Sequence, residues 1–418
     1  MKICLMCAEV AVEPLLDLGL QPVSSHLTMS PTQQVVQHSL GLGGCQACGL
    51  VQVLQPFPYQ SLVPPFERLI YREPEQHLDA MVQRAIALPG VEKSSTVAGV
   101  TYKDQSTLDR FARLGFERTW CVDLAHDLGV SDPCANIETV QAQLTPERAA
   151  EIVRRRGPVD ILIVRHILEH SENPARLLRA LATLLRRGGY MIVEVPDCEG
   201  NIARQDYTMI WEEHTLYFTR STFGGIMPVA NCRSLATEVA PYMFENCLVQ
   251  FGQQIDDDYS KTAPRTRDAD LGIIRAYASS FSNWTQDYRA LLADHTRDGR
   301  RVALYGAGHL TCAFVNFHDL AELIAFVVDD TPQKQGRYLP KCGLPIKSHE
   351  ALDATQTPLC LLGLSPEIEE KVIANKSGFL AAGGKFSSIF AGSHRSVRQL
   401  LPAQTGVSVH SDCRPRHQ

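Results

Sequence analysis

Short apolar runs alternate with longer amphipathic stretches in two regions of this chain. In the earlier region, a helical stretch at 77–88 precedes strand-like runs at residues 94–100, 118–124, 160–165 and 189–195. In the later region, a helical stretch at 309–320 lies among strand-like runs at residues 300–306, 324–330 and 357–364. Strands that alternate with helices are typical of βαβ units in a parallel, doubly wound sheet. The pattern therefore predicts an α/β protein with two Rossmann-like regions.

The rest of the chain has a different character. Residues 1–60 are rich in Cys, Gly, Pro and Gln without a long amphipathic helix, and the polar, Pro-containing stretch 255–270 suits a linker. We therefore expect a small module over 1–60, an α/β domain over 70–250 and a second α/β domain over 271–418. The length of 418 residues agrees, because a single hydrophobic core rarely serves more than about 300 residues.

Composition narrows the possible functions. Hydrophobic residues make up 44% and charged residues 21% of the chain, and no apolar run approaches the roughly 18 residues of a membrane-spanning helix. The 40 basic and 46 acidic residues give a net charge of −6, which argues against a nucleic-acid-binding surface. Cys4 and Cys7 stand where a signal peptide would carry its apolar stretch. We expect a cytoplasmic protein that acts on a small molecule.

Four cysteines form two CxxC pairs, Cys4 with Cys7 and Cys45 with Cys48. Each pair holds two thiolates at a spacing that tetrahedral Zn²⁺ accepts, and four sulfur ligands make a closed, structural site. The chain has 13 cysteines, and an odd number without a secretory signal favours free thiols and a metal over disulfides. The alternatives are cysteines unrelated to a metal, or a redox CxxC whose usual βαβ context is missing. We expect a zinc-binding module.

Polar residues follow two strands of the earlier α/β region, at the strand ends where open α/β sheets bind ligands. His166, Glu169 and His170 follow the strand at 160–165, and Asp123 ends the strand at 118–124. An acidic residue at the latter place can accept hydrogen bonds from a ribose. The alternative is that the first three residues cap a helix or face solvent.

The densest polar group is WEEHTLYFT at 211–219, where Glu213 adjoins His214 between Trp211 and Tyr217. A histidine beside a carboxylate can act as a general base near neutral pH. An exposed polar turn is the alternative.

The later α/β region opens with the turn LYGAGHLTCAF. Gly306 and Gly308 stand between a strand and a helix, and Asp329 follows about 20 residues on, as in a dinucleotide-binding fingerprint. The third glycine of that fingerprint is Thr311 here. The turn is an incomplete match to an NAD-binding site.

Taken together, these motifs resemble the sugar C-methyltransferases that act on nucleotide-linked keto-deoxysugars. CLMC, LDLGLQPV and CQACGLVQ are similar to the zinc-binding module of that family, and HILEH with RRGGYMIVEVP to the later strands of its methyltransferase domain. WEEHTLYFT is similar to its catalytic segment, and FVVDDTPQKQGRYLPKCGLPI to its C-terminal domain. In two places the chain differs: Gly99 is the single glycine of the first-strand turn, and Trp211 stands where the family has tyrosine.

The resemblance implies a class I methyltransferase domain that binds S-adenosylmethionine, with Zn²⁺ as a second cofactor. The implied reaction is removal of a proton beside a ketone, followed by attack of the enolate carbon on the cofactor's methyl group. By resemblance, His214 is the base, Glu213 assists it, His170 lies near the sugar, and Tyr71 or Tyr59 reaches the site.

We expect the cofactor to contact three features of the chain. These are the loop that runs from Gly99 to Asp104, the side chain of Asp123, and His166. Two rival functions stay open from the sequence: an NAD-linked oxidoreductase that uses the Gly306 turn, and a non-catalytic nucleotide-sugar-binding protein.

Overall fold

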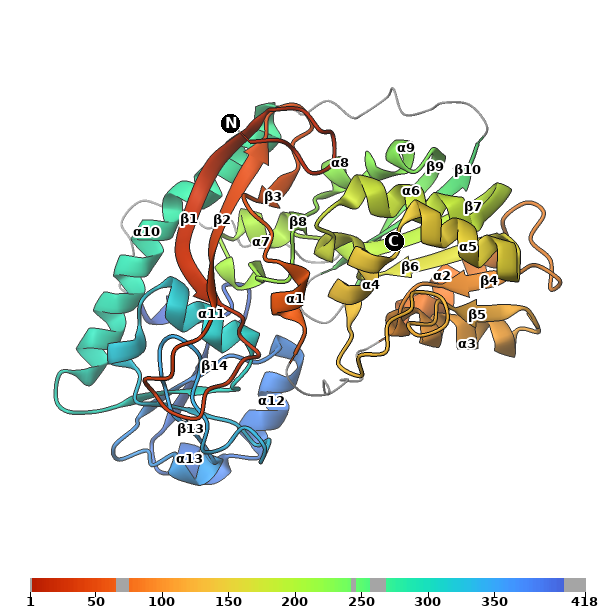
Figure 1. The fold of residues 1–418 in the computed structure, drawn as a ribbon. Helices are drawn as coiled ribbons and strands as arrows, with labels where there is room; N and C mark the ends of the chain where they lie inside the picture. Colours follow the sequence, from red (N-terminus) through yellow and green to blue (C-terminus); the bar gives the residue numbers. More distant parts are fainter. Residues whose placement is uncertain (1, 65–74, 242–245, 256–267, 402–418) are drawn as a thin grey trace, which may run out of the picture.

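The structure is a computed structural model that describes residues 2–64, 75–241, 246–255 and 268–401. Three sheets organise the described chain (Figure 1). The expected catalytic Tyr71 and most of the expected linker lie outside the described residues.

The first sheet is antiparallel and joins the N-terminal strands to a strand from the middle of the chain. Its order is β1 (Val12–Pro22), β2 (Gln37–Cys45), β3 (Val51–Val53) and β8 (Leu216–Tyr217). The short helix α1 (Tyr59–Leu62) follows β3. Because β8 pairs with β3, the sheet reaches into the segment WEEHTLYFT, which the sequence pattern did not indicate.

The second sheet has the order β5-β4-β6-β7-β10-β9. Its strands are β4 (Val97–Gly99), β5 (Thr119–Cys121), β6 (Val159–Arg165), β7 (Leu185–Pro196), β9 (Cys232–Ala240) and β10 (Cys247–Gln254). The four expected strands pair in parallel, whereas β10 runs antiparallel to both of its neighbours. The sequence pattern did not indicate the β9–β10 pair. It predicted longer strands than β4 and β5, because apolar residues continue beyond the residues that are hydrogen-bonded to neighbouring strands.

Helices cover both faces of the second sheet. Alternate residues of β6 show this: Ile161 and Ile163 pack with one set of helices, and Leu162 and Val164 with the other. One set is α2 (His77–Ile86) and α3 (Gln105–Arg113); the other includes α5 (Pro146–Arg156) and α6 (Pro174–Leu184). The remaining helices of this part are α4 (Ile137–Gln143), α7 (Glu199–Ala203), α8 (Arg220–Phe223), α9 (Ile226–Val229), and the 3₁₀ turns η1 (Tyr102–Asp104), η2 (Leu168–His170) and η3 (Tyr207–Met209).

The third sheet is parallel throughout and has the order β13-β12-β11-β14-β15. Its strands are β11 (Val302–Tyr305), β12 (Phe326–Val328), β13 (Ile346–Lys347), β14 (Leu359–Leu362) and β15 (Lys385–Ser388). Its helices are α10 (Asp268–Thr296), α11 (His309–Phe317), α12 (Pro366–Ala374), α13 (Ser377–Ala381), and the 3₁₀ turns η4 (Ala321–Leu323), η5 (His349–Ala351) and η6 (Val397–Leu400). The pattern predicted β11, β12, β14 and α11, but not the edge strands β13 and β15.

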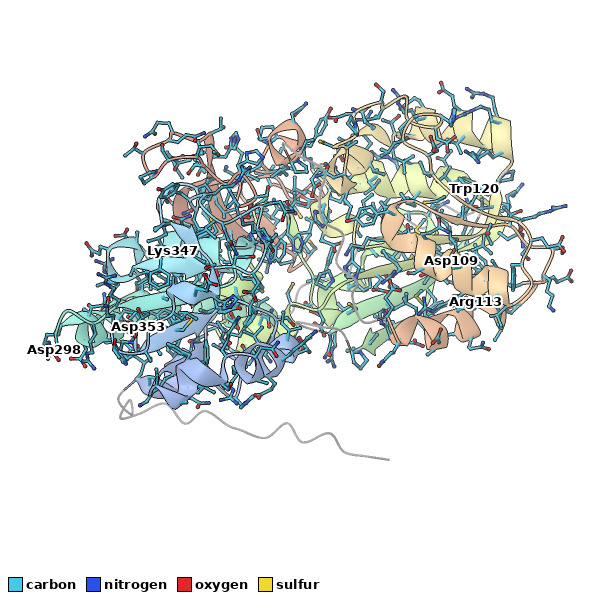
Figure 2. The ribbon with its side chains drawn as sticks, turned by 90° about the horizontal axis from the view of Figure 1, so that it is seen from below. Asp109, Arg113, Trp120, Asp298, Lys347 and Asp353 are labelled. Carbon is cyan, nitrogen blue, oxygen red and sulfur yellow. The ribbon has the colours of Figure 1, made fainter. Side chains whose placement is uncertain are left out.

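The long helix α10 runs beside β1 and β2 before the chain enters the third sheet (Figure 1). Ile274 and Tyr277 of α10 share one buried cluster with Leu16 of β1 and with Tyr207 and Ile210 from the middle of the chain. The second and third sheets lie at opposite ends of the molecule: Asp109, Arg113 and Trp120 mark one end and Asp298, Lys347 and Asp353 the other (Figure 2). Among the described helices, none is both long and apolar enough to cross a bilayer.

Candidate active site and cofactor region

The turn after β6 brings the first histidines of the site together. β6 ends at Arg165, and His166 takes a left-handed backbone conformation (φ 49°) that turns the chain sharply into η2. The turn ends at His170, which is buried. Sharp, strained turns of this kind are frequent at functional sites.

The segment 211–215 is fixed onto this turn by Thr215. The Thr215 amide donates to the carbonyl of Glu169 at 2.6 Å, and its hydroxyl donates to the carbonyl of Ser171 at 2.6 Å. As a result the rings of His170 and His214 meet edge to face, with centroids 4.7 Å apart. The two histidines come from distant parts of the sequence and now face one another.

Three buried carboxylates surround His170. Nδ1 of His170 lies 2.8 Å from Oε1 of Glu138, a residue of α4, and side-chain atoms of Glu138, His170 and Glu213 lie within 4.8 Å of one another. A third carboxylate, Glu169, forms a similar group with His170 and His214. Burial lowers the pKa of His170, but the Glu138 hydrogen bond and the negative charges of Glu169 and Glu213 outweigh it and leave the pKa raised.

Several buried polar atoms around His170 make no hydrogen bond within the described chain. They are Oε2 of Glu138, Oε2 of Glu169, Nε2 of Gln141 and Oγ of Ser171. A buried polar group without a partner costs about 1–3 kcal/mol, so such groups are uncommon unless a ligand or water meets them. Of these atoms, the carboxylate oxygens of Glu138 and Glu169 belong to residues grouped with His170.

Aromatic stacking continues the site toward the third sheet. Trp211 stacks on His214 with centroids 5.4 Å apart, and its ring also stacks on His309 at 4.0 Å. Tyr217 is fully buried and its hydroxyl lies 3.2 Å from both the amide nitrogen and the carbonyl oxygen of Trp211. Trp211 is therefore a bridge between the segment 211–219 and α11.

The loop from Gly99 to Asp104 is closed by its own carboxylate. Oδ2 of Asp104 accepts from the amides of Val100 (2.7 Å) and Thr101 (2.9 Å), and Oδ1 accepts from the amide of Arg165 at 2.9 Å. A Cβ on Gly99 would lie 2.6 Å from the Cβ of Asp104. The glycine is therefore required for packing against Asp104, and Asp104 holds the loop rather than reaching outward. Burial raises the pKa of Asp104 to about 6 although the backbone hydrogen bonds lower it.

Asp123 stands at the carboxyl end of β5, next to that loop, and is exposed. Its Oδ1 accepts from the amide of His126 at 2.7 Å, and this bond chiefly lowers the pKa of Asp123. The ionised carboxylate can also accept from ligand hydroxyls. The described residues therefore offer an outward-facing acceptor for a ribose at the place expected for one.

His166 belongs to a buried charged network. Its Nδ1 lies 3.1 Å from Glu169 and its Nε2 lies 2.9 Å from Glu194, and Arg165 also pairs with Glu194. Burial lowers the pKa of His166, but its hydrogen-bonding neighbours outweigh it and leave the pKa well above the usual value. These contacts make His166 a residue that shapes the turn after β6.

Tyr59 lies at the rim of this site. Its amide donates to Glu172 at 2.6 Å, two residues after His170, and its hydroxyl accepts from Gln143 of α4 at 3.1 Å. Of the two tyrosines expected near the site, Tyr59 is the one the structure describes.

The four paired cysteines converge at the start of the first sheet. Sγ of Cys4 lies 3.7 Å from Sγ of Cys48, and Sγ of Cys7 lies 3.7 Å from Sγ of Cys45. Both pairs use the same turn: the residue after each pair, Ala8 or Gly49, has a positive φ, and its amide donates to the first cysteine's carbonyl. The four sulfurs form one cluster.

The Gly306–Gly308 turn of the third sheet is filled by the chain itself. A Cβ on Gly306 would lie 2.5 Å from the Leu364 side chain. Asp329, which could have met a ribose, accepts from the amide of Ala307 at 2.8 Å and pairs with Lys334 at 3.2 Å. Packing within the chain explains Gly306 and Asp329 of this incomplete fingerprint, whereas a Cβ on Gly308 would meet nothing within 4 Å.

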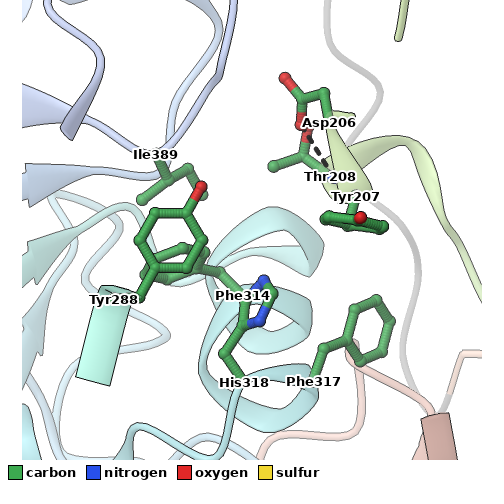
Figure 3. Close-up of a pocket in the computed structure, with 8 residues that line it drawn as sticks. All are labelled: Asp206, Tyr207, Thr208, Tyr288, Phe314, Phe317, His318 and Ile389. Carbon is green, nitrogen blue, oxygen red and sulfur yellow. Dashed lines mark hydrogen bonds between the residues drawn. The ribbon is translucent and has the colours of Figure 1, made fainter. Parts of the chain in front are cut away.

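Among the described residues, two of the cavities lie outside the histidine cluster. One, of about 10 Å³, has room for a single water molecule between α10, α11 and η3 (Figure 3). The other, of about 500 Å³, lies between the loop after β1, α1 and Arg337. Its lining residues are Val23, His26, Leu27, Gln33, Val35, Val36, Ser61 and Arg337. Only the second has the size of a small-molecule pocket.

Sequence reasoning missed Glu138, Ser24, Glu212 and His309 as neighbours of the site. Glu138 and Ser24 lie far from every motif, and only tertiary contacts reveal them. Glu212 stands within WEEHTLYFT and His309 within the Gly306 turn, so both lay in motifs that were noticed for other residues.

Comparisons with known proteins agree with this arrangement. A family model described as a methyltransferase domain matches residues 79–236, and one described as a C-methyltransferase C-terminal domain matches residues 264–390. The C-methyltransferase NovU of Streptomyces niveus is 26% identical over 322 residues, which cover 74% of this chain and 76% of NovU.

Solved structures with a similar fold include two methyltransferases. The 1,6-didemethyltoxoflavin-N1-methyltransferase of Burkholderia thailandensis is 15% identical, with a TM-score of 0.29 over 43% of this chain and 78% of that one. The magnesium protoporphyrin IX methyltransferase of Synechocystis is 14% identical, with a TM-score of 0.29 over 43% of this chain and 82% of that one.

The second sheet and the match to a methyltransferase domain define an S-adenosylmethionine-dependent methyltransferase with a class I, Rossmann-like fold. Within that class, the match of residues 264–390 to a C-methyltransferase C-terminal domain and the similarity to NovU support a C-methyltransferase.

Proposed function

We propose that this C-methyltransferase acts on a nucleotide-activated keto sugar through an enolate. The observation that carries the proposal is the group of the buried His170 and Glu213 with the half-buried His214. Beside it lie carboxylate oxygens of Glu138 and Glu169 that make no hydrogen bond within the described chain. A sugar presents several hydroxyl donors beside one carbonyl, which is the complement of such a cluster.

His214 is the general base in this mechanism. It removes the proton from the carbon beside the ketone, and Glu213, next to it in the chain, favours the protonated imidazole that results. When bound, S-adenosylmethionine supplies the methyl group that the enolate carbon attacks.

His170 has a different part. Glu138 holds its Nδ1 at 2.8 Å, and the raised pKa favours a proton on the other ring nitrogen as well. A protonated His170 can donate to the ketone oxygen as negative charge develops on it. The hydroxyl of Tyr59 at the rim, or that of Tyr71, completes the sugar site.

The nucleotide part of the substrate fits the cavity of about 500 Å³ beside the site. Val23, Leu27 and Val35 give it an apolar wall. Arg337 and the buried Nε2 of His26, which makes no hydrogen bond within the described chain, supply polar groups for a diphosphate. Ser24, two residues from His26, hydrogen-bonds Glu212 of the catalytic segment, so the cavity and the cluster adjoin.

The cofactor region is proposed at the carboxyl ends of β4 and β5. Asp123 would accept hydrogen bonds from the ribose of the bound cofactor, and the backbone of the loop that begins at Gly99 would hold its methionine part. Asp104 keeps that loop in shape, and His166 supports it from the turn after β6.

The cysteine cluster is proposed as a structural zinc site of an N-terminal module over residues 1–60. Zn–S bonds of about 2.3 Å place neighbouring sulfurs of a tetrahedron about 3.8 Å apart, and both measured pairs are 3.7 Å apart. Residues 70–250 and 271–418 are proposed as the methyltransferase domain and a second nucleotide-fold domain. The cytoplasm, where thiols stay reduced, is the proposed compartment.

A substrate test separates the possibilities. The protein is incubated with S-adenosylmethionine and a panel of nucleotide-linked 4-keto sugars, the free keto sugars and sugars without a keto group, and mass increase is measured. Methylation of the nucleotide-linked keto sugars alone supports the proposal. Methylation of a free ketone, or of oxygen or nitrogen, contradicts it. Titrations with S-adenosylhomocysteine and NADH identify which cofactor binds.

Metal content tests the zinc site. Purified protein should hold about one zinc per chain, and a strong chelator should lower the melting temperature. Cys45→Ser should reduce zinc content, whereas Cys134→Ser, a cysteine outside the cluster, should leave it unchanged. Folded protein with iron or no metal contradicts the proposal.

A further inference from the structure

His309 is the first residue of α11, a helix that packs on the third sheet. Its ring nevertheless contacts residues of the catalytic segment. Its Nε2 is 3.0 Å from the carbonyl oxygen of Ile210, and its Nδ1 is 2.8 Å from Oε2 of Glu212. The side chains of His309 and Glu212 are only 8% and 5% exposed. The turn that resembled a dinucleotide fingerprint therefore places a histidine against WEEHTLYFT.

The partners of His309 determine its protonation. Oγ of Ser24, whose hydroxyl donates to Glu212, also lies 3.2 Å from Nδ1. Because a carbonyl oxygen and an ionised carboxylate only accept hydrogen bonds, this geometry favours protons on both ring nitrogens of His309. Glu212 is the ionised partner, because the amide and hydroxyl of Ser24 both donate to its Oε1, at 2.6 and 2.7 Å. Burial raises the pKa of Glu212, but His309 and Ser24 outweigh it and lower the pKa to about 2.

The charged ring also orders the aromatic residues beside the base. It stacks on Trp211 with centroids 4.0 Å apart, a cation against the face of an indole. Trp211 in turn stacks on His214. Three segments thus meet at Glu212: the chain after β1 through Ser24, the catalytic segment, and α11.

We propose that His309 is a positioning residue for methyl transfer, which as an imidazolium holds Glu212 and Trp211 and thereby places the ring of His214. His309 does not touch the reacting atoms and acts through Trp211 and the backbone of Ile210. The inference rests on the proposed role of His214 as the base. It gives the third sheet an indirect part in catalysis, through the position of His214.

The first arm of the test needs no substrate. Long-range ¹H–¹⁵N NMR of the parent protein at pH 7.5 should show protons on both ring nitrogens of His309, with the signals assigned by their loss in His309→Gln. The ring signals of His214 should shift in the same variant. A His309 with one bare nitrogen overturns the proposal, whether or not a substrate is known.

The second arm uses methylation kinetics. His309→Gln and Glu212→Gln should each lower kcat by about 10–100-fold with little change in KM, because a displaced base costs rate rather than binding. The double variant should be no slower than the slower single variant, since the pair acts as a unit. His349→Gln is the matched control, because His349 pairs with Asp330 in the same sheet but is half exposed.

The outcomes are distinct. A kcat for His309→Gln within twofold of the parent value, in protein that melts normally, overturns the proposal. If His309→Gln does not fold, Glu212→Gln and the NMR arm decide. If the parent protein methylates no keto sugar, the proposed function fails, and the NMR arm alone decides whether His309 is the charged residue that positions His214.

Discussion

The second and third sheets begin with the same local design and use it differently. In each, a strand ends at a glycine turn and an acidic residue ends the neighbouring strand. Asp123 of the second sheet is exposed beside its turn, whereas Asp329 of the third sheet is 7% exposed and accepts from the amide of Ala307 within its turn. The same pattern thus leaves the carboxylate of Asp123 available to a ligand, whereas the carboxylate of Asp329 is occupied by hydrogen bonds within its own turn.

The comparison shows what a glycine turn does and does not establish. A Cβ on Gly99 would collide with the Asp104 side chain, and a Cβ on Gly306 would collide with Leu364. Both glycines are therefore explained by packing inside the chain. A cofactor site depends on which polar groups are left facing outward. The following experiments test that distinction.

The largest effect, on the rate of proton exchange, is expected for substitution of His214, which contacts the turn after β6 of the second sheet. His214→Ala should slow exchange of the substrate's acidic carbon-bound proton with deuterated water by about 10²–10⁴-fold, because a positioned general base is lost. Proton exchange is followed by NMR with S-adenosylhomocysteine present. His394→Ala, an exposed histidine near the third sheet, is the control; normal exchange in His214→Ala would place the base elsewhere.

A smaller effect is expected on cofactor affinity. Asp123→Ala should weaken S-adenosylhomocysteine binding by about 10–100-fold, since hydrogen bonds to a charged group contribute about 1.5–3 kcal/mol. Isothermal titration calorimetry measures it. Asp329→Ala should bind as the parent does, and equal losses in both variants would refute the distinction between the two acids.

Stability should show the reverse order. Asp329→Ala removes the acceptor for the amides of Ala307 and Thr331 and the partner of Lys334. A loss of about 1–3 kcal/mol in the free energy of unfolding is expected. Urea unfolding should show a much smaller loss for Asp123→Ala, because Asp123 is exposed; a greater loss for Asp123→Ala would contradict the assignment.

The smallest effect concerns pH. The pKa of Asp104 is raised to about 6, so its carboxyl is mostly ionised at pH 7.5 and about one quarter ionised at pH 5.5. If the loop binds the cofactor only with Asp104 ionised, S-adenosylhomocysteine affinity should fall about fourfold between these values. Asp104→Asn, which cannot ionise, should show no such fall. If the affinity of the parent protein does not change with pH, cofactor binding by the loop does not depend on the ionisation of Asp104.

The raised pKa of Asp104 also determines whether its contribution to the free energy of unfolding rises or falls with pH. A folded pKa above the unfolded value of 3.8 means that the folded protein binds the Asp104 proton more tightly. The stability from this group is therefore present below the unfolded pKa and is lost as pH rises toward 6. Comparison of the parent with Asp104→Asn across that range measures it.

Much of the fold was predictable because its signals are local. The apolar runs at β6, β7, β11 and β14 are buried on both faces, so continuous apolar sequence marked them well. The edge strands β13 and β15 are short and half polar, and β10 reverses direction, which no local pattern encodes. β8 pairs through two residues within a segment noticed for its chemistry, so its strand character was hidden.

The candidate site was only partly predictable for a similar reason. His170, Glu213 and His214 stand in motifs whose composition suggested chemistry. Glu138 contributes through the fold of α4 alone, and nothing in the sequence around it marks a contact with His170. The roles of Asp104 and His166 depend on which way their side chains point, which only the tertiary structure supplies.

The pairing of β3 with β8 has a consequence for folding. Val51 and Tyr217 are partners in one ladder although the whole of β4 to β7 lies between them in the chain. Contacts of such sequence separation close late, after the intervening sheet has formed and the entropy of a long loop has been overcome. We therefore expect His214, the proposed base, to reach its place as one of the final events of folding, so an incompletely folded chain holds its histidines apart.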